Sequence, residues 1–200
     1  DLRSPLTAMR VRAEMVDEEE TRDSLVASVE EMQSMVDATL TFARGLTGNE
    51  AVETVEFGEF LRDLQADKIV EFTLNDGPQM QMRLRPNAMR RALRNLIENA
   101  VRYGKHARVS WVREHDSLFI TIKDDGPGIP EKDTVRVFEP FVRLEESRSL
   151  ETGGHGLGLS IARSIVRAHG GDITLENRNE GGLVAIVQLP LVADQHNEGD

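Results

Sequence analysis

Hydrophobic positions near the start of the chain recur at helical spacing, in two runs separated by the acidic residues 17–20. The first run is Leu2, Leu6, Met9, Ala13 and Val16, and the second is Leu25, Val29, Met32, Val36, Thr39 and Ala43. A 3.5-residue repeat is typical of helices that pack in a bundle. The pattern predicts an antiparallel helical hairpin over 1–45 that pairs with a second copy as a four-helix bundle. The alternative is that both stripes pack on the rest of the same chain.

Beyond a predicted linker at 45–56, short apolar runs alternate with helical patterns. Helices are predicted at 57–66, 86–103 and 156–169, and strands at 69–74, 79–84, 109–113, 118–123, 173–177 and 183–189. The predicted fold class is α+β: the helical hairpin, then a two-layer α/β sandwich with a mixed, mostly antiparallel sheet and helices on one face. The predicted domains cover 1–47 and 52–192, followed by a polar tail at 193–200.

Composition narrows the classes of function. The 200 residues include 24 Lys and Arg against 35 Asp and Glu, a net charge of −11, which disfavours binding to nucleic acid or an anionic membrane. The chain has no cysteine, which excludes disulfides, cysteine nucleophiles and thiolate metal sites. No apolar run reaches the roughly 18 residues that a membrane helix needs. Because the first residue is not Met, we expect a piece of a longer protein, attached to a membrane only through other segments.

Three polar features carry candidate chemistry, and the first lies on the helix predicted at 86–103. At helical spacing Asn95, Asn99 and Arg102 share one stripe, opposite the apolar residues. Two amide oxygens one turn apart could serve a hard cation such as Mg²⁺, and a solvated polar face is the alternative. Residues 83–108 contain eight Lys and Arg and one acid, Glu98, which predicts either a basic patch for an anionic ligand or a solvated surface.

The second and third features are glycine-rich loops. Residues 124–130, Asp-Asp-Gly-Pro-Gly-Ile-Pro, follow a strand, so a carboxylate at the strand end could accept a hydrogen bond from a base amino group. Residues 153–159, Gly-Gly-His-Gly-Leu-Gly-Leu, lead directly into a helix, whose free N–H groups favour a phosphate. Taken alone, the first loop could be a surface turn and the second a flexible hinge.

In this order, the segments resemble the boxes of the ATP-binding domain of sensor histidine kinases. Residues 95–100 resemble the N box, 124–128 the G1 box, 138–141 the F box and 154–159 the G2 box. Residues 1–6, Asp-Leu-Arg-Ser-Pro-Leu, are similar to the segment that follows the phosphoacceptor His in this family. The resemblance covers roughly residues 1–192 and is greatest to osmosensor-type kinases.

The resemblance implies ATP and Mg²⁺ as cofactors and the receiver domain of a response regulator as partner. It also implies a homodimer through residues 1–45, no nucleic-acid partner, and a cytoplasmic location within a bacterial inner-membrane sensor. Residues 142–153 would form a lid that orders on ATP, and residues 45–50 would form a hinge between the domains.

The resemblance also assigns roles to matching positions. Asn99 would hold Mg²⁺ and take part in catalysis, Asn95 would support the phosphates, and Asp124 would accept from the adenine amino group. The remaining residues expected to bind the nucleotide are Arg102, Tyr103, Gly126, Gly128, Ile129, Phe138, Gly154, His155, Gly156, Leu157 and Gly158. Phe141 would join Phe138 in anchoring the lid.

The chain departs from the family pattern at its first residues. The phosphoacceptor His is expected immediately before Asp1, so the printed chain is expected to bind ATP without phosphorylating itself. Asp1 would orient that His or take its proton, and Ser4 stands where the phosphatase pattern has Thr or Asn, which leaves phosphatase activity open. The alternatives are an ATP-driven clamp of the gyrase and chaperone type, with Glu98 as general base, and a non-catalytic dimerising module.

Overall fold

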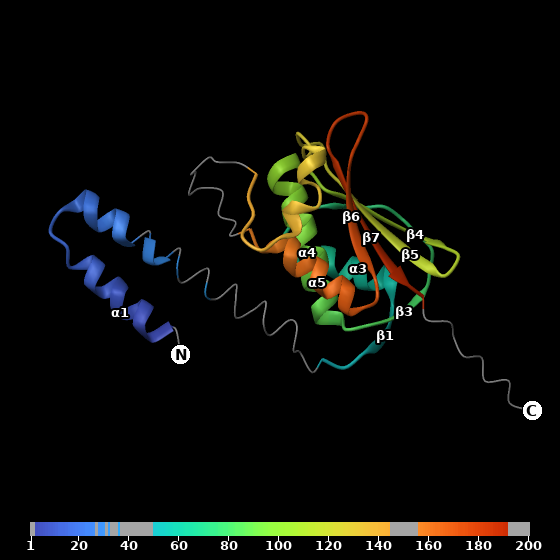
Figure 1. The fold of residues 1–200 in the computed structure, drawn as a ribbon. Helices are drawn as coiled ribbons and strands as arrows, with labels where there is room; N and C mark the ends of the chain where they lie inside the picture. The colour runs from blue at the N-terminus through green and yellow to red at the C-terminus, as the bar shows by residue number, and fades with distance from the viewer. Residues whose placement is uncertain are drawn as a thin grey trace, which may run out of the picture. The chain divides into compact units, whose positions relative to one another are not determined.

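The computed structural model describes residues 3–26, 28–30, 32, 36, 50–144 and 156–191. The chain divides into two compact units, 1–47 and 48–200 (Figure 1). In the first unit, α1 spans Arg3–Glu14, and helix resumes at residue 19 after a turn. The two helical segments on either side of this turn confirm that part of the periodicity prediction. Thr39 and Ala43, the last two positions of the second stripe, lie outside the described residues.

The second unit is built on a five-stranded sheet with the order β2-β4-β5-β7-β6. Its strands are β2 (Thr73–Leu74), β4 (Arg108–Glu114), β5 (Ser117–Lys123), β6 (Asp172–Asn177) and β7 (Leu183–Pro190). Strand β2 pairs parallel with β4, and the other neighbours pair antiparallel. The mixed, mostly antiparallel sheet confirms the prediction.

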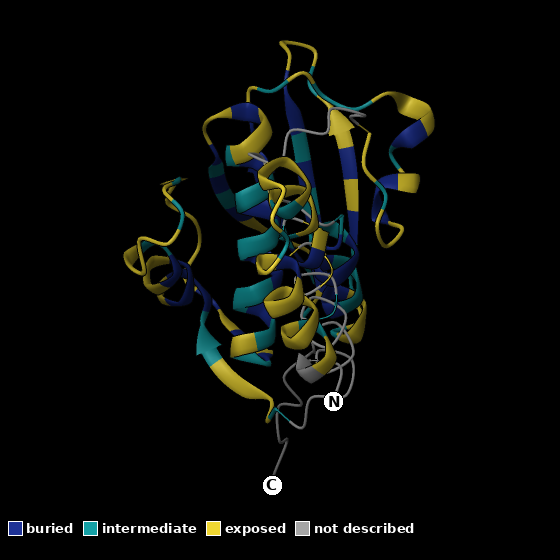
Figure 2. Ribbon diagram, turned by 90° about the vertical axis from the view of Figure 1, so that its left-hand side faces the viewer, coloured by how far each residue is buried: buried dark blue, intermediate teal, exposed yellow. Residues whose placement is uncertain are grey.

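Three helices cover one face of this sheet and complete the two-layer α+β fold (Figure 1). They are α3 (Phe57–Ala66), α4 (Pro86–Gly104) and α5 (Gly158–Ala168). Buried residues alternate with partly or fully exposed residues along the strands (Figure 2), and in β5 the buried members are Leu118, Ile120 and Ile122. Period-2 alternation therefore directs one side of each strand into the core. The apolar stripe predicted on α4 is buried against this side: Met89, Leu93, Leu96, Ile97 and Ala100.

Two local predictions were wrong, at 45–56 and at 69–74. Residues Glu53–Glu56, predicted as linker, form β1, which pairs antiparallel with β3 (Gln81–Leu84) in a separate two-stranded sheet. The segment has one apolar residue, Val55, so its hydrophobic pattern gave no strand signal. The Glu56 carboxylate holds the strand in place by accepting hydrogen bonds from Glu59 N at 2.6 Å and Met80 N at 3.2 Å. Of residues 69–74 only Thr73–Leu74 form a strand, because Ile69 is exposed to solvent. Two 3-10 helices, η1 (Glu131–Asp133) and η2 (Arg136–Phe138), were not predicted.

Candidate active site

The three polar features identified in the sequence meet at one cavity of about 170 Å³ in the second unit. Helix α4, the loop after β5, the segment 137–144 and the N-terminus of α5 contribute to its wall. The predicted site residues that line the cavity are Asn95, Asn99, Arg102, Tyr103, Asp124, Gly128, Ile129, Gly156 and Gly158. The cavity therefore brings together predicted site residues that are up to 63 residues apart in the sequence, from Asn95 to Gly158.

Helix α4 presents Asn95 and Asn99 to this cavity because its apolar stripe faces the sheet. The Nδ2 atom of Asn95 is buried and has no hydrogen-bond partner among the described residues. A buried donor without a partner costs free energy, about 1–3 kcal/mol, unless a ligand or water accepts from it. A Cβ atom on Gly158 would lie 3.9 Å from the Cβ of Asn95, so this donor lies beside the start of α5.

The N-terminus of α5 is the second feature of the site. Its N-cap residue, Leu157, makes no side-chain capping hydrogen bond, so the first-turn N–H groups receive no side-chain acceptor there. These N–H groups carry the positive end of the helix dipole, and together with Asn95 Nδ2 they form a donor set suited to an anion such as phosphate. Arg102 and Arg143 add positive charge to the same cavity wall.

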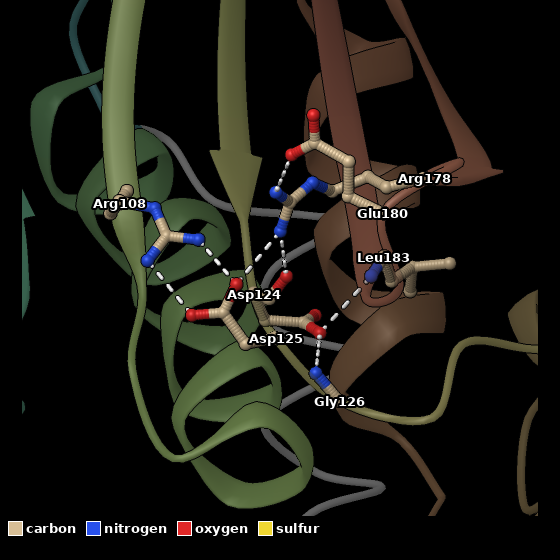
Figure 3. A network of polar contacts seen from close by, with 7 residues as sticks. All are labelled: Arg108, Asp124, Asp125, Gly126, Arg178, Glu180 and Leu183. Carbon is tan, nitrogen blue, oxygen red and sulfur yellow. Dashed lines mark hydrogen bonds and ion pairs between the residues drawn. The ribbon is translucent and has the colours of Figure 1, made fainter.

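Asp124 is the third feature, and its carboxylate is held from two directions. Only 5% of Asp124 is exposed. Its Oδ1 accepts from Gly126 N at 2.8 Å and from Leu183 N at 3.1 Å (Figure 3), which leaves Oδ2 without a hydrogen bond from any described residue. Gly104 packs against the same side chain, where a Cβ would overlap the Cβ of Asp124. A fixed carboxylate with one available oxygen can accept a hydrogen bond from a ligand amino group.

The loop that follows Asp124 is held by a residue that sequence reasoning missed. Asn177, at the end of β6, accepts from Ile129 N at 2.8 Å and donates to Ile129 O at 2.7 Å. Gly128 has φ +76°, and a Cβ there would overlap Asn177 Oδ1, so glycine is required at this close approach. No local signal marks Asn177, because its role depends on β6 lying near the loop that follows β5.

Some predicted site residues lie away from the cavity wall. Phe138 is buried in η2, with its ring 4.5 Å from the guanidinium carbon of Arg163. Leu157 is buried at the start of α5, and Gly126 contributes its hydrogen bond to Asp124 without lining the cavity. Ser4 lies on α1 in the other unit. The predictions for Asp1, Gly154 and His155, and the lid beyond residue 144, fall outside the described residues.

Several cavity residues were not predicted to bind a ligand. Apolar side chains form much of the unpredicted wall: Pro127, Val137, Val142, Leu144, Leu159 and Leu183. An apolar wall with a few convergent polar groups is typical of a small-molecule site. The predicted basic patch is divided, since Arg90 and Arg94 pair with Asp67 outside the cavity wall.

Comparison with known families agrees with this geometry. The family model described as "Histidine kinase-, DNA gyrase B-, and HSP90-like ATPase" matches residues 84–193. The chain belongs to this ATPase family. The matched range begins at the last residue of β3 and contains every residue that lines the cavity.

Relatives narrow the family to sensor histidine kinases. The sensor histidine kinase GtrS of Pseudomonas aeruginosa is 34% identical over 194 residues, which are 95% of this chain and 40% of GtrS. The chain thus spans about two fifths of that relative's length. The ATP-binding domain of PrrB from Mycobacterium tuberculosis is 26% identical with a TM-score of 0.59, over 72% of this chain and 100% of that chain. The second unit is therefore a catalytic ATP-binding domain of the histidine kinase type.

A third comparison concerns the fold of nearly the whole chain. The histidine kinase ThkA, solved in complex with the response regulator protein TrrA, has a TM-score of 0.66 at 20% identity, over 94% of this chain and 57% of that chain. Among the described residues, no helix combines the length and apolar character needed to cross a membrane.

Proposed function

We propose that the cavity binds Mg²⁺·ATP and that the chain is the kinase core of a two-component sensor. The observation that carries this proposal is the convergence, in one cavity, of three features: Asn95 Nδ2, which has no partner among the described residues, the α5 N-terminus and the Asp124 carboxylate, whose Oδ1 is fixed by two hydrogen bonds. Donors for an anion lie at one part of the wall, and an acceptor for an amino group lies at another. A nucleoside triphosphate with an amino-bearing base has both of the complementary groups.

The proposed pose follows from this separation of donors and acceptor. The adenine amino group donates to Asp124 Oδ2, and the ring packs on apolar wall residues such as Ile129 and Leu183. The phosphates accept from Asn95 Nδ2 and from the N–H groups at the start of α5, with Arg102 supplying positive charge. This pose gives the buried Asn95 donor a partner, which favours ligand binding.

Mg²⁺ fits the residues next to this phosphate position. Asn99 lies one helical turn from Asn95 on the cavity wall, and its amide oxygen is a hard ligand of the kind Mg²⁺ accepts alongside phosphate oxygens and water. We assign Asn99 as the protein ligand. Bound there, Mg²⁺ supplies charge neutralisation for the triphosphate.

The proposed reaction is phosphoryl transfer to a His expected next to Asp1 in the intact protein. The His ring nitrogen attacks the γ-phosphorus, the bond to the bridging oxygen breaks, and ADP leaves. Asp1 orients the imidazole or takes its proton. The phosphoryl group then passes to an Asp of a response regulator, a partner supported by the ThkA complex with TrrA. Removal of that phosphate again, with Ser4 taking part, is a further proposed step.

Residues 1–45 are proposed to form the dimer and the docking surface for the regulator. Met9, Met15 and Leu25 expose 50%, 76% and 42% of their area, so the first unit carries apolar surface that a second copy could bury. Because the cavity takes ATP, we propose a cytoplasmic location, with membrane attachment through segments outside this chain.

Labelled ATP tests the function directly. The chain, extended upstream to include the expected His, is incubated with ATP carrying γ-³²P, and both protein and free phosphate are counted. Acid-labile, base-stable label on the protein supports the kinase. Rapid release of phosphate without protein label favours a clamp-type ATPase, for which Glu98 on the cavity wall is the candidate base. The absence of both protein label and released phosphate indicates a non-catalytic module. This result and the release of phosphate without protein label each contradict the kinase proposal.

A further inference from the structure

Three charged residues form a clamp behind Asp124, outside the cavity wall (Figure 3). Asp125 lies between two guanidinium groups: Arg108 from β4 donates to its Oδ2 at 2.8 Å and also to its Oδ1, and Arg178 donates to Oδ1 at 2.9 Å. These hydrogen bonds, from Arg108 first and then Arg178, hold the pKa of Asp125 well below its usual range. The Asp125 side chain therefore stays charged and keeps both arginines in place at neutral pH.

Arg178 links this clamp to Asp124 itself. The same Nη1 atom that binds Asp125 donates to the backbone oxygen of Asp124 at 2.6 Å. Only 20% of the Arg178 side chain is exposed, whereas 56% of Arg167 is exposed in the comparable clamp on Asp172. Arg178, in the β6–β7 turn, is therefore held against the loop after β5, and it fixes the peptide that carries the Asp124 side chain.

The β6–β7 turn is shaped to bring Arg178 and Leu183 to Asp124 together. Arg178 N donates to Gly182 O at 3.0 Å, and Asp124 N donates to Leu183 O at 2.9 Å. Gly182 has φ +93°, and a Cβ there would overlap the Asp124 backbone oxygen that Arg178 binds. The turn thus approaches Asp124 closely, and it supplies donors to both the backbone oxygen and Oδ1.

We propose that Arg178, held by Asp125 and Arg108, is a positioning residue that aims Asp124 Oδ2 at the amino group of the purine and so sets the preference for ATP. This inference rests on the proposed ATP site. Arg178 touches no part of the nucleotide; it acts through the backbone of Asp124. Its loss leaves the phosphate-binding groups on α4 and α5 intact, so the effect should depend on whether the base carries the amino group.

The test compares two triphosphates by calorimetric titration with Mg²⁺ on the full chain. One is a nonhydrolysable ATP analogue, and the other is the matching analogue of purine riboside triphosphate, which lacks the 6-amino group. Arg178→Ala should weaken binding of the ATP analogue about tenfold, the size of one hydrogen bond to a charged group, and binding of the second analogue less than about twofold. Arg178→Lys, which keeps the positive charge and a single nitrogen that can donate, should recover part of the loss.

Matched variants separate positioning from general damage. Arg167→Ala removes an arginine from the other two-arginine clamp, on Asp172, and should leave both affinities at the wild-type value. Asp125→Asn keeps the side-chain shape while removing the charge between Arg108 and Arg178, and should also weaken the ATP analogue selectively. An equal loss for both analogues, or no loss for either, overturns the positioning role. If the wild-type chain binds neither analogue, both the proposed ATP site and this inference are contradicted. If the wild-type chain binds the ATP analogue but Arg178→Ala weakens both analogues equally, only this inference is contradicted.

Discussion

Asp124 and Leu183 are joined by two hydrogen bonds, although 59 residues separate them in the sequence. Asp124 N donates to Leu183 O at 2.9 Å, and Leu183 N donates to Asp124 Oδ1 at 3.1 Å. The pair continues the antiparallel register of β5 and β7, in which Lys123 lies opposite Val184. The sheet itself therefore sets the direction of the carboxylate, and the site is positioned by rigid strands.

Asp124→Asn is predicted to weaken ATP binding strongly. The amide has one oxygen, which is needed by the N–H groups of Gly126 and Leu183, so an NH₂ group would face the adenine amino group. The loss of a hydrogen bond to a charged acceptor corresponds to about 1.5–3 kcal/mol of binding free energy. Calorimetry of the variant measures this, with Asp116→Asn in the exposed β4–β5 turn as the control. An affinity of Asp124→Asn equal to that of wild type would contradict the proposed hydrogen bond between Asp124 and the adenine amino group.

Asn99→Asp is predicted to abolish binding of Mg²⁺·ATP. A fixed negative charge would then lie beside the triphosphate, in a partly enclosed site where repulsion is stronger than in water. The measurement is a titration of the variant with the ATP analogue, with and without Mg²⁺. Asn75→Asp, in an exposed segment, provides a matched charge change that should leave binding intact. Undiminished affinity of Asn99→Asp would contradict the role given to Asn99.

Asp172 is predicted to make folding stability depend on pH in the acid range. Hydrogen bonds from Arg163, at 2.8 and 3.2 Å, are the main cause that holds the pKa of Asp172 below its usual range, and Arg167 adds to them. A carboxylate whose pKa is lower in the folded chain stabilises the fold above its unfolded pKa of about 4, and this contribution is lost as pH falls through the folded pKa. Asp172→Asn should therefore melt below wild type at neutral pH, with a gap that narrows under acid conditions.

Thermal melting at a series of pH values measures that gap. Asp116→Asn serves again as the control, because its carboxylate lies in an exposed turn. A difference between wild type and Asp172→Asn that stays constant from about pH 7 to about pH 3 would contradict the linkage argument.

Removal of residues 1–45 is predicted to leave ATP binding unchanged and to give a monomer. The second unit contains the whole described cavity, and residues 48–200 form a compact unit of their own. Light scattering on the full and shortened chains measures the oligomeric state, and calorimetry measures the affinity. A shortened chain that is still a dimer would refute the assignment of the dimer interface to the helical hairpin.

Local patterns were sufficient to predict much of this structure. The apolar stripe of α4 predicted the helix and placed Asn95 and Asn99 opposite the core, and the alternation in β5 predicted a strand with one buried face. Asp124 could be identified because its role depends on its own loop. The convergence of the three features was predicted only through the resemblance to a family.

Long-range relationships could not be predicted in the same way. Arg108, Asn177 and Arg178 hold the loop around Asp124 from β4 and from the end of β6, and their proximity arises from the strand order β4-β5-β7-β6. Gly104 ends α4 without any motif, yet it packs on Asp124. Strand β1 was missed because its pairing with β3 depends on backbone hydrogen bonds and the Glu56 side chain, which leave no hydrophobic pattern.

One cavity is proposed to bind both the base and the phosphates of magnesium-bound ATP. Calorimetric titration of the wild-type chain with a nonhydrolysable ATP analogue, in Mg²⁺ and in EDTA, measures this binding. We expect saturable binding to one site per chain that is weakened by EDTA and by Asp124→Asn. The absence of binding in Mg²⁺, or binding that neither change affects, would contradict the proposal.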